Sequence, residues 1–270
     1  MPVHTEWVHF QESSGYLARP ERAALPLPAV LVVQEIWGVD AHIEDVTRRL
    51  AEAGYAALAP DLYSSGGVRP EPLLRERISE VQAIMNNLPS TAWGDAAARS
   101  AALAGLPASE RARIEESLGA LFGRLGQLDR FLPALQAAVR YMHSECPASA
   151  GQRVACLGFC MGGGLSVLLA CEEPELAGAA IFYGSAPPLD RVARIQCPVV
   201  GFYGGLDERV NAGLPAFTEA MRAAGKQFEP QVYEGAAHAF FNDTRPSYNV
   251  RATRDSFARL LAFLGRTVAT

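Results

Sequence analysis

Three residues in the second half of the chain have the types and the order that nucleophilic catalysis needs, and the first of them is Cys160. It stands in residues 158–164, GFCMGGG, which match a Gly-x-Ser-x-Gly nucleophile elbow with cysteine in place of serine. In such an elbow the nucleophile occupies a strained turn, and a side chain at either flanking glycine would collide with the neighbouring strand or helix. The helix that follows points its first N–H groups at the site, which favours an oxyanion there.

Glycines between a strand and a helix have other uses, namely phosphate binding and tight packing. A dinucleotide-binding fingerprint needs Gly-x-Gly-x-x-Gly after the first strand, and here the spacing differs and the strand lies in mid-chain. The other cysteines have different surroundings: Cys156 alternates inside a strand, Cys171 ends a helix and Cys197 precedes a strand, so we interpret them as small buried hydrophobic residues. Cys160 is therefore the candidate nucleophile.

Asp207 and His238 supply an acid and a base in the expected order. Asp207 follows an apolar strand in YGGLDERV (203–210), and His238 follows the next strand in GAAHAFF (235–241). In α/β-hydrolases the chain order is nucleophile, acid, histidine. Taken alone, Asp207 could be a helix N-cap and His238 a loop histidine. The agreement of order and strand-end placement for all three residues instead favours a triad in which His238, oriented by Asp207, manages the protons of Cys160.

Short β-branched runs alternate with amphipathic or Ala-rich stretches, which predicts an α/β-hydrolase fold with a mainly parallel central sheet flanked by helices. Strands are expected over 28–33, 55–59, 153–158, 177–183, 198–203 and 228–233. Helices are expected over 41–53, 212–224 and 247–264, and residues 3–16 are expected to form an antiparallel edge hairpin. No internal repeat or linker marks a second domain, so 1–270 is interpreted as a single domain.

Residues 72–142 contain no convincing strand and are rich in Ala, Arg and Leu, with breaks at Pro89, Gly94, Gly105 and Pro107. We expect several helices there, one of which crosses back to the sheet. The part from about 72 to 130 is longer than one crossover requires. It is therefore predicted to be a helical insertion, and a lid, an oligomer contact and a solvated excursion stay open as its role.

Composition excludes several classes of function. A net charge of -5 provides no basic face for nucleic acid or an anionic membrane surface. The first residues lack a basic region followed by an apolar one, and no run reaches the length of a membrane span. Five well-separated cysteines without a Cys-x-x-Cys pair indicate free thiols and a cytoplasmic protein. No His-x-x-x-His pair or His/Asp cluster suggests a metal site. A monomer or small homo-oligomer is expected.

Beyond the triad, the sequence resembles the dienelactone hydrolase family. The motifs that carry the resemblance are QEIWG (34–38), APDLY (59–63), GFCMGG (158–163), FYG (182–184), GGLD (204–207) and GAAHAFF (235–241). The resemblance spans roughly residues 28–264, with 72–130 poorly matched. It implies a carboxylic ester hydrolase that acts on small enol-lactones without a cofactor. It also implies that Glu35 contacts the resting thiol and shifts when substrate binds.

The oxyanion hole is expected to consist of two backbone N–H groups. Ile36 follows the first central strand, where the second donor of such a hole usually lies, and Met161 follows the nucleophile. Trp37, Tyr63, Tyr183 and Phe240 are candidates for the substrate pocket. The family holds the substrate carboxylate with arginines, one of them shortly after the catalytic histidine, but here Asn242 and Asp243 stand in that stretch. The resemblance therefore implies the reaction type of the family for this sequence, but not the native substrate of the family.

Two other functions compete with ester or lactone hydrolysis. One is thioesterase or acyltransferase chemistry on a larger acyl group, with the middle helices as a lid, which product analysis with added acceptors would reveal. The other is a non-catalytic binding protein that kept the fold, which a degenerate triad would have supported. All three triad positions are filled, so hydrolysis of an activated ester or lactone is the leading interpretation.

Overall fold

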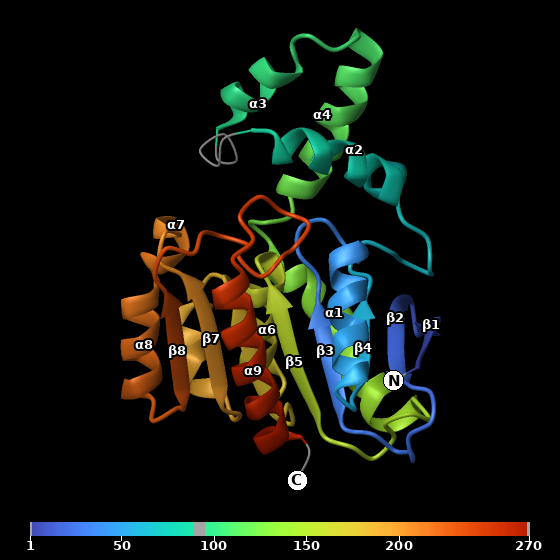
Figure 1. Cartoon of the computed structure of the whole chain (residues 1–270), viewed down its shortest axis with the longest axis vertical. Coiled ribbons are helices and arrows are strands. Elements are labelled where there is room, and N and C mark those ends of the chain that lie inside the picture. The colour runs from blue at the N-terminus through green and yellow to red at the C-terminus, as the bar shows by residue number, and fades with distance from the viewer. Residues whose placement is uncertain (1, 89–94, 269–270) are drawn as a thin grey trace.

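The computed structural model describes residues 2–88 and 95–268, and an eight-stranded sheet forms its centre (Figure 1). The strands are β1 (Val3–Phe10), β2 (Ser13–Pro20), β3 (Ala29–Val33), β4 (Ala56–Pro60), β5 (Val154–Phe159), β6 (Gly178–Phe182), β7 (Val199–Gly204) and β8 (Phe228–Tyr233). They lie side by side in the order β1-β2-β4-β3-β5-β6-β7-β8. The pairs β1·β2 and β2·β4 are antiparallel, and the others are parallel. The predicted α/β fold with a mainly parallel sheet is confirmed.

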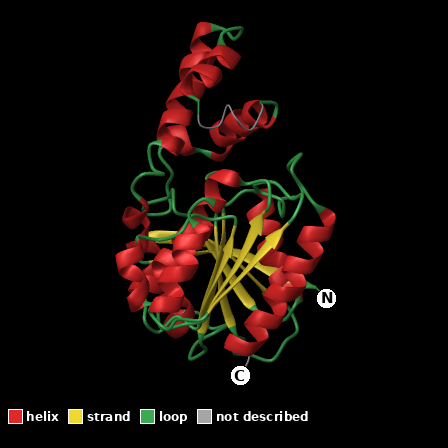
Figure 2. Cartoon of the chain, turned by 90° about the vertical axis from the view of Figure 1, so that its left-hand side faces the viewer, coloured by secondary structure: helices red, strands yellow, loops and turns green. Residues whose placement is uncertain are grey.

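Helices cover both faces of this sheet (Figure 2). They are α1 (Ala41–Glu52), α2 (Arg75–Asn86), α3 (Ala96–Leu103), α4 (Ala108–Phe122), α5 (Leu132–Arg140), α6 (Met161–Glu172), α7 (Glu208–Asn211), α8 (Leu214–Ala223) and α9 (Val250–Thr267). Single turns of tighter or wider helix are η1 (Glu71–Leu73), η3 (Leu128–Phe131), η4 (Tyr141–Glu145) and η5 (Leu189–Arg194). Helices α1 and α9 pack on one face, and α5, α6 and α8 pack on the other.

Alternation along the central strands explains why both faces are apolar. In β3, Leu31 and Val33 belong to the apolar cluster under α5 and α6, whereas Val30 and Val32 belong to the cluster under α1 and α9. Successive side chains of a strand point to opposite faces. A parallel sheet covered by helices on both sides therefore requires a continuous apolar run, and this is what made the central strands readable in the sequence.

The predicted elements agree closely with the observed ones. The strand predicted over 228–233 coincides with β8, and the other five central strands differ by one residue at most at each end. The opening hairpin is confirmed but continues to Pro20. The helix predicted from 212 begins at Leu214, after a separate short helix α7 that Asp207 caps. The final helix begins later than predicted because Asn249 caps it, and it runs to Thr267.

A helical cap stands above the carboxyl ends of the parallel strands (Figure 1). We define the cap as the described residues of Arg75–Phe122, which comprise α2, α3 and α4. Within it, Arg77 is 8% exposed and donates to Glu71, to Glu116 and to the carbonyl of Arg113. The helices predicted for this stretch are confirmed. Gly105 and Pro107 separate α3 from α4, whereas Pro89 and Gly94 lie outside the described residues.

The cap is not separated from the sheet by a break in the apolar interior. Ile78, Val81 and Leu118 of the cap belong to the same apolar cluster as Leu31 of β3 and Leu165 of α6. Burial of these side chains stabilises the cap on the rest of the chain.

Across residues 2–88 and 95–268, none of the helices has both the length and the apolar character that crossing a bilayer would demand.

Candidate active site

Cys160 lies on the sharp turn between β5 and α6. Its backbone is left-handed, with φ of 54° and ψ of -114°, and the residue is half-exposed. A Cβ atom on Gly158 would lie 2.0 Å from the carbonyl oxygen of Gly162, and one on Gly162 would lie 2.3 Å from that of Val33. Only glycine allows α6 to approach the strands this closely. The elbow expected from the sequence therefore presents the sulfur atom at the carboxyl edge of the sheet.

Asp207 and His238 are brought together from the ends of two neighbouring strands. Asp207 follows β7 and is 7% exposed, and His238 follows β8. Nδ1 of His238 donates to Oδ2 of Asp207 across 2.5 Å. The other oxygen of Asp207 accepts from the N–H of Val210 at 3.4 Å, so the carboxylate also caps α7. The same carboxylate thus contacts His238 and caps α7.

His238 also interacts with Cys160, and this shifts its ionisation. Burial alone would lower the pKa of His238, but the negative charge of Cys160 and hydrogen bonds to Asp207 and Cys160 raise it to about 10. A nearby anion favours the protonated imidazole. In this arrangement His238 therefore holds its proton at neutral pH.

Glu35 is buried two residues after the end of β3, where it accepts a hydrogen bond from a side-chain amide. Asn242 donates from Nδ2 to Oε2 of Glu35 at 2.9 Å. The oxygen of the same amide accepts from the N–H and the hydroxyl of Thr244 at 3.0 and 2.7 Å, which fixes the orientation of the amide. Burial raises the pKa of Glu35, and the charge of Asp40 adds to this, while Arg245 and the Asn242 hydrogen bond act in the opposite direction.

Tyr183 joins these groups from the end of β6. Its ring lies 5.1 Å from that of His238 and 5.4 Å from that of Phe240, both in edge-to-face geometry. Burial raises the pKa of the Tyr183 hydroxyl, and the charges of Glu35 and Cys160 raise it further. Glu35 and Cys160 therefore both lie near this hydroxyl. Tyr183 has φ of 41° and Ala239 has φ of 61°, so three left-handed residues other than glycine surround the site, with Cys160 as the third.

The two expected oxyanion donors come from separate elements. Ile36 is in the turn that follows β3, and its carbonyl oxygen accepts from the Tyr63 hydroxyl at 2.7 Å. Met161 is the first residue of α6, where helix N–H groups have no partner within the helix. Burial raises the pKa of the Tyr63 hydroxyl, and the charge of Cys160 adds to this rise, so Tyr63 lies near the site. Trp37 contacts Arg245, whose guanidinium carbon lies 5.8 Å from the centre of the indole ring.

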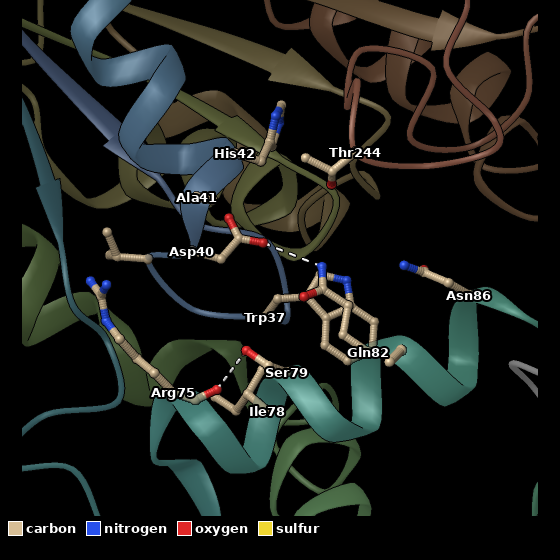
Figure 3. A pocket seen from close by; sticks show the side chains of 12 residues that line it. Trp37, Asp40, Ala41, His42, Arg75, Ile78, Ser79, Gln82, Asn86 and Thr244 are labelled. Atoms are coloured by element: carbon tan, nitrogen blue, oxygen red, sulfur yellow. Dashed lines mark hydrogen bonds between the residues drawn. The ribbon is translucent and has the colours of Figure 1, made fainter.

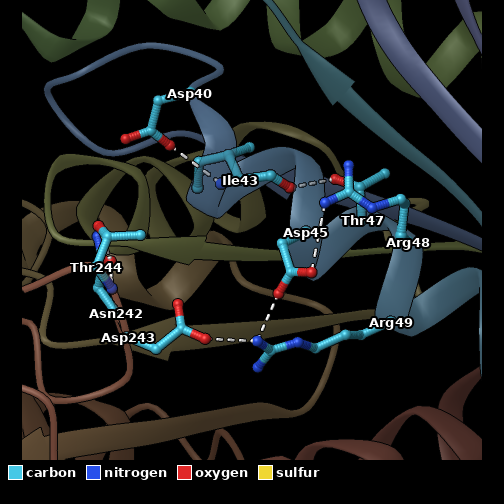
Figure 4. A network of polar contacts seen from close by, with 9 residues as sticks. All are labelled: Asp40, Ile43, Asp45, Thr47, Arg48, Arg49, Asn242, Asp243 and Thr244. Carbon is cyan, nitrogen blue, oxygen red and sulfur yellow. Dashed lines mark hydrogen bonds and ion pairs between the residues drawn. The ribbon is translucent and has the colours of Figure 1, made fainter. Parts of the chain in front are cut away.

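Two sets of residues near the site were not singled out in the sequence. One is the buried ion pair between Arg69 and Asp61, 2.7 Å long, which lies beside the turn of Ile36. The other anchors the loop after His238 to α1: Arg49 pairs with Asp243 at 2.7 Å and with Asp45 at 2.5 Å (Figure 4). Asp61 stands in the APDLY motif, but residue type and spacing do not predict with which residues these charges pair, so only the fold reveals the contacts.

The cavity drawn in Figure 3 lies between the start of α1 and helix α2 of the cap. It has a volume of about 340 Å³, and Trp37, Asp40, Gln82 and Thr244 are among its lining residues. Cys160 and His238 do not line it, and neither do Tyr63, Tyr183 and Phe240. Of the aromatic residues expected at the pocket, Trp37 therefore faces this cavity, while Tyr183 contacts the imidazole. The described residues contain no cluster of His, Cys, Asp and Glu that could hold a metal ion.

The model of the dienelactone hydrolase family matches residues 13–268. A "Putative carboxymethylenebutenolidase" of Saccharolobus solfataricus is 36% identical over 264 residues, which are 95% of this chain and 97% of that protein. A protein of the same name from Methylorubrum extorquens is 34% identical over 258 residues, 91% of this chain and 74% of that one.

Among solved structures, that of a "Putative Dienelactone Hydrolase" from Klebsiella pneumoniae subsp. pneumoniae superimposes with a TM-score of 0.66. It is 28% identical, and the superposition covers 98% of this chain and 99% of that one. A dienelactone hydrolase-like promiscuous phosphotriesterase, 22% identical, shares the fold with a TM-score of 0.67 over 99% of this chain and 100% of that one. The predicted α/β-hydrolase fold is confirmed by these likenesses.

Proposed function

The chain belongs to the dienelactone hydrolase family of ester-bond hydrolases, and on that premise we propose that it opens an activated ester or enol-lactone through an acyl-cysteine intermediate on Cys160. The observation that carries the proposal is the contact chain from Asp207 through His238 to the sulfur of Cys160. Nucleophile, base and orienting acid in hydrogen-bond reach of one another are the signature of nucleophilic catalysis.

In the acylation step the sulfur of Cys160 attacks the acyl carbon of the substrate, and the carbonyl oxygen becomes an oxyanion. The tetrahedral intermediate collapses with cleavage of the bond between the acyl carbon and the leaving oxygen, and the His238 imidazolium gives its proton to that oxygen. In the second step neutral His238 takes a proton from water, and the resulting hydroxide adds to the thioester carbon. The bond between the acyl carbon and the sulfur then breaks, which releases the carboxylic acid product and regenerates the thiolate of Cys160. Asp207 holds the imidazole in the orientation that both steps need.

Two backbone N–H groups, those of Ile36 and Met161, bind the oxyanion in this proposal. The Met161 donor is supported by its place in the first turn of α6, where the helix dipole also favours negative charge. Each donor of an oxyanion hole contributes about 3 kcal/mol of transition-state stabilisation. A thioester forms readily only when the leaving group is good, so enolates and phenolates should be released much faster than simple alkoxides.

We assign Glu35 the task of restraining the resting thiol. Glu35 is buried, and a carboxylate near a thiol disfavours ionisation of that thiol by like-charge repulsion. A Glu35→Gln variant is expected to react faster with iodoacetamide at neutral pH than the parent, because the negative charge that opposes thiolate formation is gone. Identical alkylation rates over the whole pH range would remove Glu35 from the mechanism.

Intact mass spectrometry tests the nucleophile directly. The protein is mixed with a panel of activated esters and lactones, and the mass increase of one acyl group is expected on the parent and on Cys171→Ala, which loses a buried thiol elsewhere. Cys160→Ala should show neither the adduct nor hydrolysis above background. If Cys160→Ala retained turnover at the parental rate, the acyl-cysteine mechanism would be wrong.

A further inference from the structure

We infer that Tyr63 is a positioning residue of the oxyanion hole, which holds the turn of Glu35–Gly38 so that the N–H of Ile36 keeps one direction. The inference rests on the proposed function, which assigns that N–H to the hole. It gives Tyr63 a task different from lining the substrate pocket. Two peptide groups flank Ile36, and each accepts a hydrogen bond.

The first peptide group joins Glu35 to Ile36 and carries the N–H in question. Its carbonyl oxygen accepts from the N–H of Gly38 at 3.2 Å, which closes the turn. A peptide group is planar and trans, so its N–H points in the direction opposite to its C=O. The hydrogen bond to Gly38 therefore directs the N–H of Ile36 out of the turn, where it is available to a ligand.

The second peptide group joins Ile36 to Trp37, and Tyr63 fixes it. The hydroxyl of Tyr63 donates to the carbonyl oxygen of Ile36 at 2.7 Å. The backbone has two soft dihedral angles at each residue, and both are determined once the peptide planes on either side are held. Without the hydroxyl, the peptide group between Ile36 and Trp37 loses its hydrogen bond to Tyr63. The direction of the N–H of Ile36 then becomes less well defined.

Tyr63 is itself rigidly placed. Its side chain is 4% exposed, and its own N–H donates to Oδ1 of Asp61 at 3.1 Å. Oδ2 of Asp61 accepts from Nε of Arg69 at 2.7 Å, in an ion pair whose side chains are 6% and 7% exposed. Next to Tyr63, the N–H of Leu62 donates to the side-chain oxygen of Gln34 at 3.1 Å. The segment that carries the hydroxyl is thus tied to the segment that carries the turn.

Arg69 also supports the turn from its other side. Gly38 has φ of 79°, and a Cβ atom there would lie 3.1 Å from Nη2 of Arg69. The planar guanidinium therefore packs directly against the turn, while Nε holds Asp61. Burial raises the pKa of Tyr63 well above its ordinary range, so the hydroxyl keeps its proton and remains a donor at every pH at which the enzyme works.

Two reactions of the same sulfur separate positioning of the hole from other effects. Acylation by p-nitrophenyl acetate develops an oxyanion, and alkylation by iodoacetamide does not. We expect Tyr63→Phe to lower kcat for p-nitrophenyl acetate by about 10-fold, less than the loss of a whole donor, with KM nearly unchanged. The rate of alkylation of Cys160 should equal that of the parent, and Tyr203→Phe, a buried tyrosine of β7, should leave both reactions unchanged.

A second variant guards against poor folding of the first. Arg69→Lys keeps a positive charge beside Asp61 but removes the planar group against Gly38, and we expect a loss of about 3-fold in acylation with unchanged alkylation. The inference is overturned if both variants acylate at the parental rate, or if alkylation falls in parallel with acylation. If the parent itself is not acylated at Cys160, the proposed function fails instead, and the two failures are therefore distinguishable.

Discussion

The carboxyl edge of the sheet and the cap above it are held in place by different means. At the sheet edge, Cys160, Asp207 and His238 follow strands whose backbones are fixed by ladder hydrogen bonds. The cap meets the rest of the chain through apolar packing and through polar contacts that include Arg75 with Glu44 of α1 at 2.8 Å and Gln82 with Asp40, the N-cap of α1, at 3.4 Å. If the proposed function holds, changes at the sheet edge should alter the reaction itself, whereas changes in the cap should alter stability or access.

The largest effect is expected at the sheet edge itself. Replacing His238 with Ala should lower kcat/KM for p-nitrophenyl acetate by about 10³-fold or more, because the variant lacks both proton acceptor and donor. The matched control is His143→Ala, an exposed histidine bonded to the carbonyl of Gln152, which should retain parental activity. If His238→Ala were nearly as active as the control, His238 would not be the group that transfers the protons.

A buried histidine in the sheet-bearing part should make this part sensitive to acid. His42 packs between the rings of Phe159 and Phe241, and burial lowers its pKa to about 3, against the opposing charge of Asp243. Between about pH 6.5 and pH 3 the unfolded chain binds a proton that the folded chain does not. The free energy of unfolding should therefore fall by about 1.4 kcal/mol per pH unit as the pH drops through this window.

Urea unfolding at pH 7 and pH 4.5 measures this contribution. The loss of stability between the two should be smaller in His42→Phe than in the parent by about 2.5 kcal/mol. The variant is compared with itself across pH, so any change in packing cancels. An equal loss in both proteins would mean that the acid sensitivity resides elsewhere.

Within the cap, Arg77 should matter for stability and leave the chemistry alone. Arg77→Met removes the charged hydrogen bonds to Glu71 and Glu116 and leaves the carbonyl of Arg113 without this donor. We expect a loss of about 2 kcal/mol in the free energy of unfolding, with kcat unchanged in the folded fraction. An exposed arginine on α5 provides the control, Arg140→Met, and a fall in kcat specific to Arg77→Met would show that the cap takes part in the reaction.

The smallest effect is expected where the cap touches α1. Arg75 pairs with Glu44, and its side chain is 44% exposed. An ion pair this accessible to water contributes less than about 1 kcal/mol. Arg75→Ala should therefore unfold at nearly the same urea concentration as the parent and show parental kcat. If the variant were clearly less stable than the parent at low salt but equally stable at high salt, the ion pair would contribute more than expected.

The sequence predicted the strands and the meeting of Asp207 with His238 better than it predicted the surroundings of the site. Continuous apolar runs such as 198–203 identify buried strands, and the glycines around Cys160 report a steric requirement of the elbow. Asp61 and Arg69 gave no such signal, because their pairing depends on how two loops meet. The helical character of 72–130 was readable, but the contact of Arg77 with Glu116 joins residues far apart in the chain, and no local pattern encodes it.

Three residues around the sulfur, Cys160, Tyr183 and Ala239, have left-handed backbones without being glycine. Each such conformation costs about 1–3 kcal/mol, a considerable share of the 5–15 kcal/mol of net stability typical of a folded domain. Substitutions that relieve the strain at these positions should consequently raise thermal stability and lower turnover. A glycine at position 239 would relieve strain and raise the melting temperature, while loosening the loop on which the imidazole depends.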